Sequence, residues 1–275
     1  ARSKWCVTEK VHGANLSIYV SRNRGIKCAK RTQFIDAKDS FFGYHQVVDR
    51  FREGILSLAA DIFRNDERVS TVILYGELFG GAYPDVESSG HVQPVQVGVS
   101  YSPRIEFMLF DICLCRADTE QYLPFRDTIE LAEKHDIFYA QPLFIGSRTE
   151  AMSYKCEFSS TIPGRLGLPS ITLTPNLAEG IVVRSMDQAY SCGSVAEREI
   201  IKIKHEDFSE GEGCPASALV DIRHVTAWIL GLVNRNRVAA AASKVGSVQD
   251  TSSWSDIIDM VIEDVKEEAG DAMDE

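Results

Sequence analysis

Hydrophobic and polar positions follow two different spacings along the first two hundred residues. The stretches "WCVTEKVHGANLSIYV" (5–20) and "GIKCAKRTQF" (25–34) combine β-branched and aromatic residues around polar ones, which predicts strands. In residues 45–65 the apolar positions recur at helical spacing, which predicts an amphipathic helix. Further apolar stretches predict strands at 70–81, 104–115, 178–186 and 197–208.

Two parts of the chain break this pattern. Residues 82–104 are mostly polar and contain three prolines, so we expect a long surface loop there. After a linker-like stretch, "SEGEGCPAS" (209–217), the apolar residues form two helical stripes, over 219–232 and 254–265. The pattern therefore predicts an α+β domain of mixed or antiparallel sheets over residues 1–209, followed by a small helical segment over 210–275.

The charge is unevenly distributed. The net charge is −11, but residues 250–275 contain ten acidic residues and one basic residue, so the rest of the chain is close to neutral. This balance argues against general binding of nucleic acid over the whole surface, but it allows a local basic groove. The apolar run 225–233 is about half of the roughly 18 residues that a membrane span needs, so no membrane partner is expected.

Seven cysteines are present, and none forms a CxxC pair. Without that ligand spacing a zinc site is not expected. Free thiols are typical of a reducing compartment.

Charged residues interrupt the predicted strands. Lys10 follows an apolar stretch and precedes Gly13, a spacing that a solvent-exposed lysine at a strand end would also explain. The other positions of this kind are Glu77, Asp111, Glu179, Lys202 and Lys204. Lys202 and Lys204 alternate with isoleucines, so both project from one face of a strand. Because buried charges are costly unless they are paired or bind a ligand, we expect a polar cleft for an anionic ligand and a divalent cation.

Six segments in chain order resemble the motifs of the covalent nucleotidyltransferases. They are "EKVHGAN", "KRT", "YGELFGG", "FMLFDI", "AEGIVVR" and "IIKIK". Their wording is most similar to the RNA ligase 2 group, and within it to the RNA-editing ligases of kinetoplastid mitochondria. The resemblance extends over residues 5–208, roughly three quarters of the chain. It implies a nucleotidyltransferase fold, with antiparallel or mixed sheets around a nucleotide cleft.

The resemblance also implies an activity, that of an ATP-dependent RNA ligase. In such enzymes a lysine attacks the α-phosphorus of ATP, the AMP passes to an RNA 5′-phosphate, and a 3′-hydroxyl displaces it. Lys10 would be the nucleophile, and Glu77 and Glu179 would hold Mg²⁺, which needs few protein ligands. Lys202 and Lys204 would contact the α-phosphate and offset charge on the pentavalent phosphorus.

The same resemblance assigns the nucleoside pocket. Phe110 and Val182 would lie on the two faces of adenine, and Glu9 and Val11 would contact the base through their backbone. Asn15 and Arg31 would lie near the ribose and phosphates, and Arg184 would line the deep end of the pocket. A core position for Phe110 remains an alternative, as do solvated positions for Arg31 and Arg184. His12 is a weaker candidate for a catalytic base. The resemblance places some adenine contacts upstream of Ala1.

The resemblance implies RNA as substrate, a nicked duplex in particular, and a mitochondrial location with a targeting segment outside this chain. DNA ligases and capping guanylyltransferases continue into an OB-fold, whereas this chain becomes helical and acidic. The resemblance to the editing ligases implies an OB-fold-containing partner protein of an editing complex. The acidic helix at 254–268 is either its docking surface or a solvated face. Another covalent nucleotidyltransferase, and a non-catalytic nucleotide- or RNA-binding member of the fold, remain alternatives.

Overall fold

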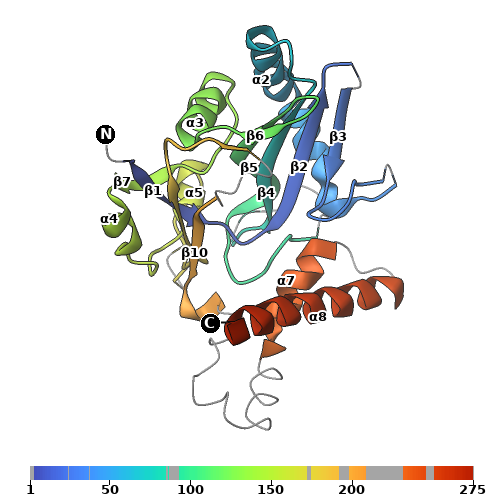
Figure 1. The fold of residues 1–275 in the computed structure, drawn as a ribbon. Helices are drawn as coiled ribbons and strands as arrows, with labels where there is room; N and C mark the ends of the chain where they lie inside the picture. The colour runs from blue at the N-terminus through green and yellow to red at the C-terminus, as the bar shows by residue number, and fades with distance from the viewer. Residues whose placement is uncertain are drawn as a thin grey trace. The chain divides into compact units, whose positions relative to one another are not determined.

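The structure is a computed structural model, and it describes residues 3–23, 25–36, 38–84, 86, 93–171, 175–191, 198–208, 232–245 and 251–274. The chain divides into two compact units, Ala1–Lys204 and His205–Glu275 (Figure 1). The domain boundary expected at 209/210 lies outside the described residues.

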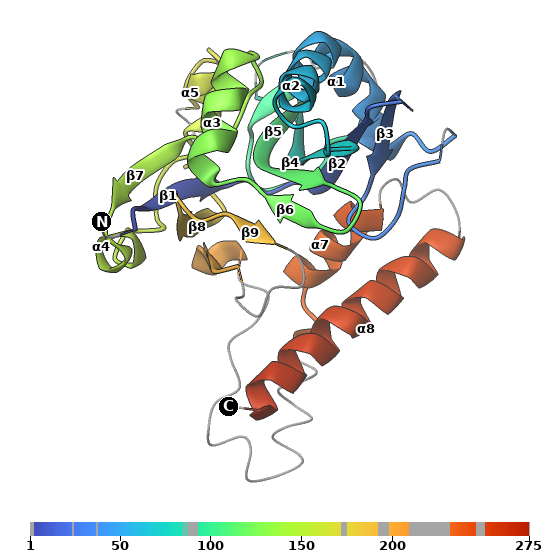
Figure 2. The same cartoon turned by 45° about the horizontal axis from the view of Figure 1, so that its top comes forward.

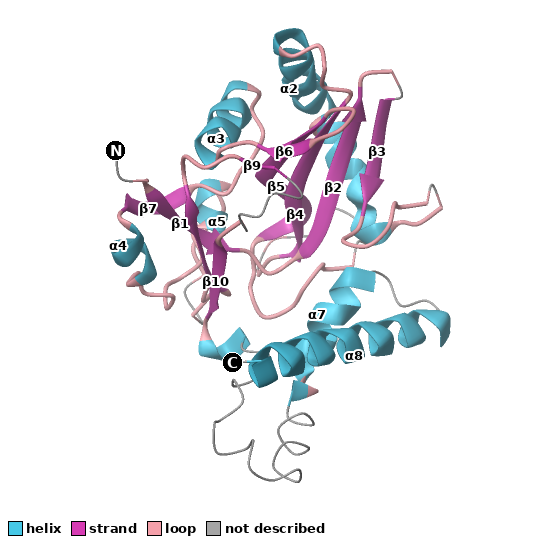
Figure 3. Ribbon diagram, viewed as in Figure 1, coloured by secondary structure: helices cyan, strands magenta, loops and turns pink. Residues whose placement is uncertain are grey.

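The first unit contains two sheets, and every pair of named strands in them is antiparallel (Figure 3). The four-stranded sheet has the order β10-β8-β1-β7, formed by β1 Trp5–Lys10, β7 Pro142–Gly146, β8 Gly180–Ser185 and β10 Ile200–Lys204. The six-stranded sheet has the order β3-β2-β4-β5-β6-β9. Its strands are β2 Ala14–Ser21, β3 Gly25–Ala29, β4 Thr71–Ala82, β5 Ser102–Cys115, β6 Glu120–Tyr122 and β9 Tyr190–Ser191.

The four-stranded sheet has one apolar face and one polar face. Trp5, Val7, Ile181 and Val183 are buried together on the apolar face. Because side chains alternate along a strand, Lys10 projects from the other face of β1. On β10, Ile201 and Ile203 pack on the same apolar cluster, so Lys202 and Lys204 project to the polar face, as the alternation predicted.

Two helices cover the apolar face of the six-stranded sheet (Figure 2). They are α1 Tyr44–Arg50 and α2 Arg52–Asn65, which follow the short η1 Phe41–Gly43. Residues Val47, Ile55 and Leu58 enter the core with Leu16 and Leu74. The amphipathic helix predicted over 45–65 is therefore confirmed, although it is interrupted at Phe51, whose φ of −97° and ψ of 6° are not helical.

The expectation of a surface loop over 82–104 was wrong for its second half. Val95, Val99 and Tyr101 are at most 7% exposed, and Val95 belongs to the main core. Residues 95–101 alternate apolar with polar or small residues, but the flanking Pro94 and Pro103 favoured a loop in the prediction. The remaining helices of this unit are α3 Phe125–Lys134, α4 Arg148–Met152 and α5 Ile162–Arg165.

The described elements of the second unit are helices. It contains η2 Glu206–Phe208, α7 Arg235–Val245 and α8 Thr251–Asp274. Ile257, Val261 and Val265 of α8 pack with Leu232 and Ala241. Of the predicted stripe on this helix, Trp254 and Ile258 remain exposed. The other predicted stripe, apart from Leu232, lies outside the described residues. In the described ranges, no helix has both the length and the apolar character of a membrane span.

Candidate functional site

Lys10 is the last residue of β1, and it lies beside β8 where three strands come together. Lys10 pairs with Gly180 on one side, and Lys204 of β10 pairs with Gly180 on the other. Gly180 has a φ of +153°, and a Cβ built on it would lie 2.1 Å from the carbonyl oxygen of Ile203. Only glycine allows this close approach. The two lysines therefore flank one residue on the polar face of the four-stranded sheet.

Glu179 is the partner of Lys10. The Lys10 Nζ lies 2.5 Å from Glu179 Oε1, and the glutamate side chain is only 3% exposed. The other carboxylate oxygen, Oε2, lies 3.6 Å from His12 Nδ1 and is buried without a hydrogen bond from any described residue. Burial alone raises the pKa of Glu179, but His12 and Lys10 outweigh it, so the pKa lies below its usual value. Glu179 is therefore ionised and retains one buried oxygen for a further ligand.

Glu77 comes from the other sheet, where it lies on β4 opposite Asn15 of β2. Burial raises its pKa to about 7; Glu179 adds to that rise, whereas Lys10 and Lys202 oppose it. Gly13 brings the sheets together here, because a Cβ on it would lie 2.8 Å from Glu77 Cγ. The structure thus brings Glu77 to the Lys10–Glu179 pair.

Lys202 adds positive charge to the same site. Partial loss of water around its ammonium group lowers its pKa, and the charges of Lys10 and Arg31 lower it further. Lys202 and Arg31 are themselves exposed, so both remain accessible to a ligand. Cations that repel one another in this way are typical of a site for a polyanion.

Glu77 and Glu179 fit a magnesium ion. Their carboxylates are the hard oxygen donors that Mg²⁺ prefers, and Mg²⁺ usually takes one or two carboxylates together with waters and substrate phosphates. The buried, unbonded Oε2 of Glu179 is available as a donor. No cluster of three or more His, Cys, Asp or Glu side chains in the described residues forms an all-protein metal cage. The donor set therefore matches a metal that is shared with a phosphate ligand.

Phe110 lies at a β-bulge. Tyr75 of β4 pairs with Asp111 and the next residue, Gly76, pairs with Leu109, so Phe110 is the extra residue of β5. A bulge redirects a side chain and is common beside active sites. Phe110 is partly exposed, whereas Leu109 and Asp111 are buried. The alternative of a fully buried core phenylalanine is therefore wrong, and its stacking role remains a prediction.

Arg184 lies inside an ion-pair network, so the solvated alternative is wrong for it. Arg184 is 5% exposed, and its guanidinium contacts Asp111 Oδ1 at 2.5 Å and donates to the Phe110 carbonyl at 2.8 Å. Arg198 pairs with the same Asp111 oxygen and lies over the Tyr122 ring. The sequence did not indicate Arg198, because no periodicity or motif marks it. Asp111 therefore forms ion pairs with both arginines.

The remaining predicted residues lie on β1, β2 and β8 and in the turn after β1. The Glu9 carboxylate accepts hydrogen bonds from Ser160 Oγ, Thr161 N and Thr161 Oγ1, so it is directed away from Lys10. Val182 lies on the Lys10 face between Thr8 and Lys202. Val11 is 4% exposed, and Asn15 accepts a hydrogen bond from Ser17. Their nucleotide contacts remain predictions.

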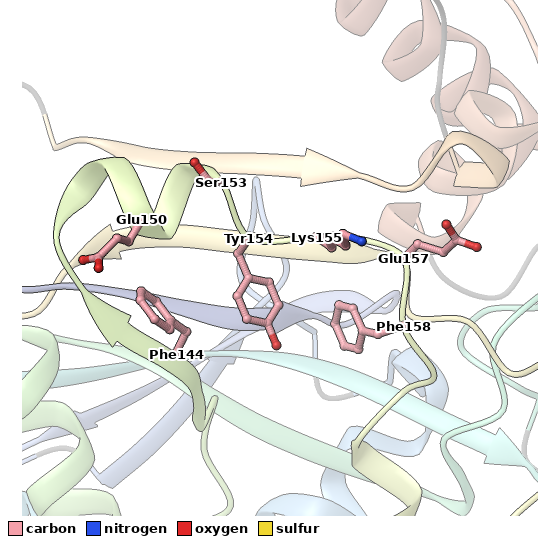
Figure 4. A pocket seen from close by; sticks show the side chains of 7 residues that line it. All are labelled: Phe144, Glu150, Ser153, Tyr154, Lys155, Glu157 and Phe158. Atoms are coloured by element: carbon pink, nitrogen blue, oxygen red, sulfur yellow. The ribbon is translucent and has the colours of Figure 1, made fainter.

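A hollow of about 590 Å³ lies elsewhere on the four-stranded sheet (Figure 4). It is lined by Phe144, Glu150, Ser153, Tyr154, Lys155, Glu157 and Phe158. Phe144 pairs with Val7 and packs on its cluster, so the hollow belongs to the face opposite Lys10. It contains none of the predicted site residues.

Comparison with known proteins supports the resemblance seen in the motifs. The RNA ligase family model matches residues 3–204. The mitochondrial RNA-editing ligase 1 of Trypanosoma brucei brucei is 33% identical over 243 residues, covering 76% of this chain and 51% of the relative. The mitochondrial RNA-editing ligase 2 of the same organism is 31% identical over 201 residues, covering 66% and 48%. The chain therefore spans about half the length of these curated relatives.

A variant of a Naegleria gruberi RNA ligase, solved with ATP and Mn, has a TM-score of 0.46 and 16% identity, covering 75% of this chain and 51% of that one. The family match and the antiparallel sheets confirm the predicted fold class, a nucleotidyltransferase fold with a helical segment after it. The chain belongs to the RNA ligase family.

Proposed function

We propose that this chain is the adenylyltransferase part of an ATP-dependent RNA ligase that joins 5′-phosphate and 3′-hydroxyl RNA ends. One observation supports this most: the amine of Lys10 lies 2.5 Å from Glu179, at a point where the charges of Lys202 and Glu77 act on the same site. A solvated surface lysine would not combine a nearly buried carboxylate partner with a neighbouring ammonium group, that of Lys202, and a second carboxylate, that of Glu77.

Lys10 would form the covalent link to the nucleotide. Its neutral Nζ attacks the α-phosphorus of ATP, a P–N bond forms, and the bond to pyrophosphate breaks. The ion pair with Glu179 holds this amine in place before nucleotide binds, so Lys10 must leave that pair and lose a proton before it reacts. Lys202 and Lys204 would bind the phosphate oxygens and stabilise the charge that develops on them. The AMP then passes to the RNA 5′-phosphate, and the 3′-hydroxyl displaces it.

Glu77 and Glu179 would hold Mg²⁺, consistent with their donor chemistry. When bound, the ion would neutralise charge on the phosphates. Phe110 and Val182 would enclose the adenine, Glu9 and Val11 would contact it through their backbone, and Asn15 and Arg31 would contact the sugar and phosphates. Arg184 would close the deep end by fixing the carbonyl of Phe110, to which it donates a hydrogen bond.

The relatives support a more specific proposal for the substrate and the location of the protein. Both are named mitochondrial RNA-editing ligases, so we infer a nicked RNA duplex as substrate and a mitochondrial location. The described part of the second unit is helical and contains no strand. We further propose an OB-fold-containing partner protein of an editing complex, as the resemblance to the editing ligases implies.

The test is covalent labelling with ATP or GTP that carries a radioactive α-phosphate, in the presence of Mg²⁺. We expect ATP to label the chain and a peptide map to place the AMP on Lys10. Lys10→Ala should abolish labelling, whereas Lys155→Ala, a lysine beside the hollow on the opposite face, should leave it unchanged. Labelling by GTP alone would indicate a capping enzyme, and no labelling would indicate a non-catalytic member of the fold.

A second assay distinguishes the substrate. Nicked duplexes of RNA and of DNA with a labelled 5′-phosphate are incubated with the protein, ATP and Mg²⁺. Sealing of RNA supports the proposal, and sealing of DNA alone would contradict it.

A further inference from the structure

Tyr101 contacts the backbone that carries the candidate nucleophile. It lies in the segment that was expected to be a surface loop, immediately before β5, and is only 2% exposed. Its hydroxyl oxygen accepts a hydrogen bond from the backbone N–H of His12 at 2.9 Å, across 89 positions in sequence. A phenol this deeply buried is held by the protein around it, so its hydroxyl has a defined position.

The His12 amide lies in the turn that joins the two sheets. Strand β1 ends at Lys10 and β2 begins at Ala14, and the two strands belong to different sheets. The pairing of β1 with β8 ends at Lys10. The hydrogen bond that the next part of the backbone makes to Tyr101 is therefore a direct restraint on how the chain leaves Lys10.

The other side of the same turn is closed by β4. A Cβ on Gly13 would lie 2.3 Å from the carbonyl oxygen of Leu78, so the backbone at Gly13 lies directly against that strand. The next residue of β4, Phe79, meets the Tyr101 ring edge-on, with centroids 5.5 Å apart. Leu78 and Phe79 of β4 thus contact the turn at Gly13 and the Tyr101 ring, respectively.

We propose that Tyr101 is a positioning residue for Lys10: its hydroxyl fixes the backbone at His12, and thereby holds the amine at the place where it meets Glu179 and the nucleotide. This inference rests on the proposed function of Lys10. Burial raises the pKa of Tyr101 well above its usual value, and the carboxylates of Glu9, Glu179 and Glu77 add to that rise. The hydroxyl therefore stays neutral wherever the protein is folded, and remains an acceptor for the amide.

The decisive variant is Tyr101→Phe, which removes one oxygen atom and keeps the ring. Tyr83→Phe is a matched control, because Tyr83 is 7% exposed and its hydroxyl donates at 2.5 Å to a backbone carbonyl, that of Pro169, away from the turn. Formation of the labelled adduct is followed in a single turnover over a range of ATP concentrations. For Tyr101→Phe we expect the limiting rate constant to fall at least about 10-fold, since small displacements of a reacting group are costly. The ATP concentration at half-maximal rate should not change.

The two parameters separate positioning from folding. An unchanged limiting rate would overturn the inference. So would a loss in both parameters together with a lower unfolding temperature, because that result describes a folding defect. Tyr83→Phe should match the wild type in both parameters.

Hydrogen exchange of the His12 amide provides a readout that does not depend on the reaction. Exchange should be faster in Tyr101→Phe than in the wild type and Tyr83→Phe, and equal exchange in all three would also overturn the inference. If the wild type forms no adduct with any nucleotide, the proposed function fails. In that case an exchange difference still establishes the restraint on the turn, while its role in positioning a nucleophile is refuted.

Discussion

At the scale of single residues, the site depends on charges that come from different parts of the chain. Lys10 and Glu179 are adjacent in space because β1 pairs with β8, and Glu77 reaches them from the six-stranded sheet. The neighbouring charges contribute to the shifted pKa values of Glu77 and Glu179. Two consequences can be measured on single glutamates.

Glu179→Gln keeps the shape of the side chain and removes its charge. The variant loses the ion pair with Lys10 and the proposed ligand for Mg²⁺, so we expect adduct formation to slow by at least about 100-fold. Single-turnover labelling with ATP measures this rate. Glu157→Gln, which alters a glutamate beside the hollow on the opposite face, is the control. Near-normal labelling of Glu179→Gln would count against its role.

Glu77 should make the stability of the protein depend on pH. Its pKa is raised in the folded state from 4.5 to about 7, so in this interval the folded chain holds a proton that the unfolded chain has released. The free energy of unfolding should therefore fall as pH rises through this window, and level off above it. Urea unfolding of the wild type and Glu77→Gln, from about pH 5 to about pH 8, compares the two slopes. The variant should lack this contribution, and parallel curves would contradict the assignment.

At the scale of elements, two local irregularities shape the site. The bulge at Phe110 redirects one side chain of β5, and Gly180 lets β8 approach β10 closely, so that Lys10 and Lys204 flank the same residue. The strands that carry the motifs were predicted from their apolar stretches, which lie at β1, β2, β4, β5, β8 and β10. The short strands β6, β7 and β9 were missed. β6 and β9 have only three and two residues, too few to establish a period, and β7 does not alternate apolar with polar residues.

Gly180→Ala should damage the pairing of β8 and β10. The added methyl group would lie 2.1 Å from the Ile203 carbonyl oxygen and would force an alanine into a φ of +153°. We expect a loss of about 2 kcal/mol or more in the free energy of unfolding. Gly164→Ala is the matched control, because nothing lies within 4 Å of a Cβ there. Urea unfolding of both variants provides the comparison, and equal stability would refute this account of the strand pairing.

At the scale of the whole molecule, the chain forms two compact units, and the family match ends at residue 204, where the first unit ends. Every predicted site residue lies between Glu9 and Lys204. Among the described residues, the hydrophobic clusters around Leu16 and around Val7 contain no residue beyond Ile203. The first unit therefore has its own core, and it contains every residue that is predicted for the site.

A chain that ends at Phe208 should still form the lysyl-AMP adduct. Its rate should equal that of the full chain within experimental error, because the second unit supplies none of the predicted contacts to ATP. Labelling of both chains at equal concentration tests this, and circular dichroism verifies that the shortened chain is folded. A folded but unlabelled chain would show that residues after 208 contribute to the reaction.

The local pattern of the sequence was sufficient to predict the main strands, the helix over 45–65 and the common face of Lys202 and Lys204, because alternation and helical spacing are properties of neighbouring residues. The motif resemblance predicted the family. Only the tertiary structure decided that Asp111 binds two arginines, that Glu9 is directed away from Lys10 and that Tyr101 holds the turn at His12. These contacts join residues far apart in the chain, and their geometry depends on how two sheets meet, which no local spacing encodes.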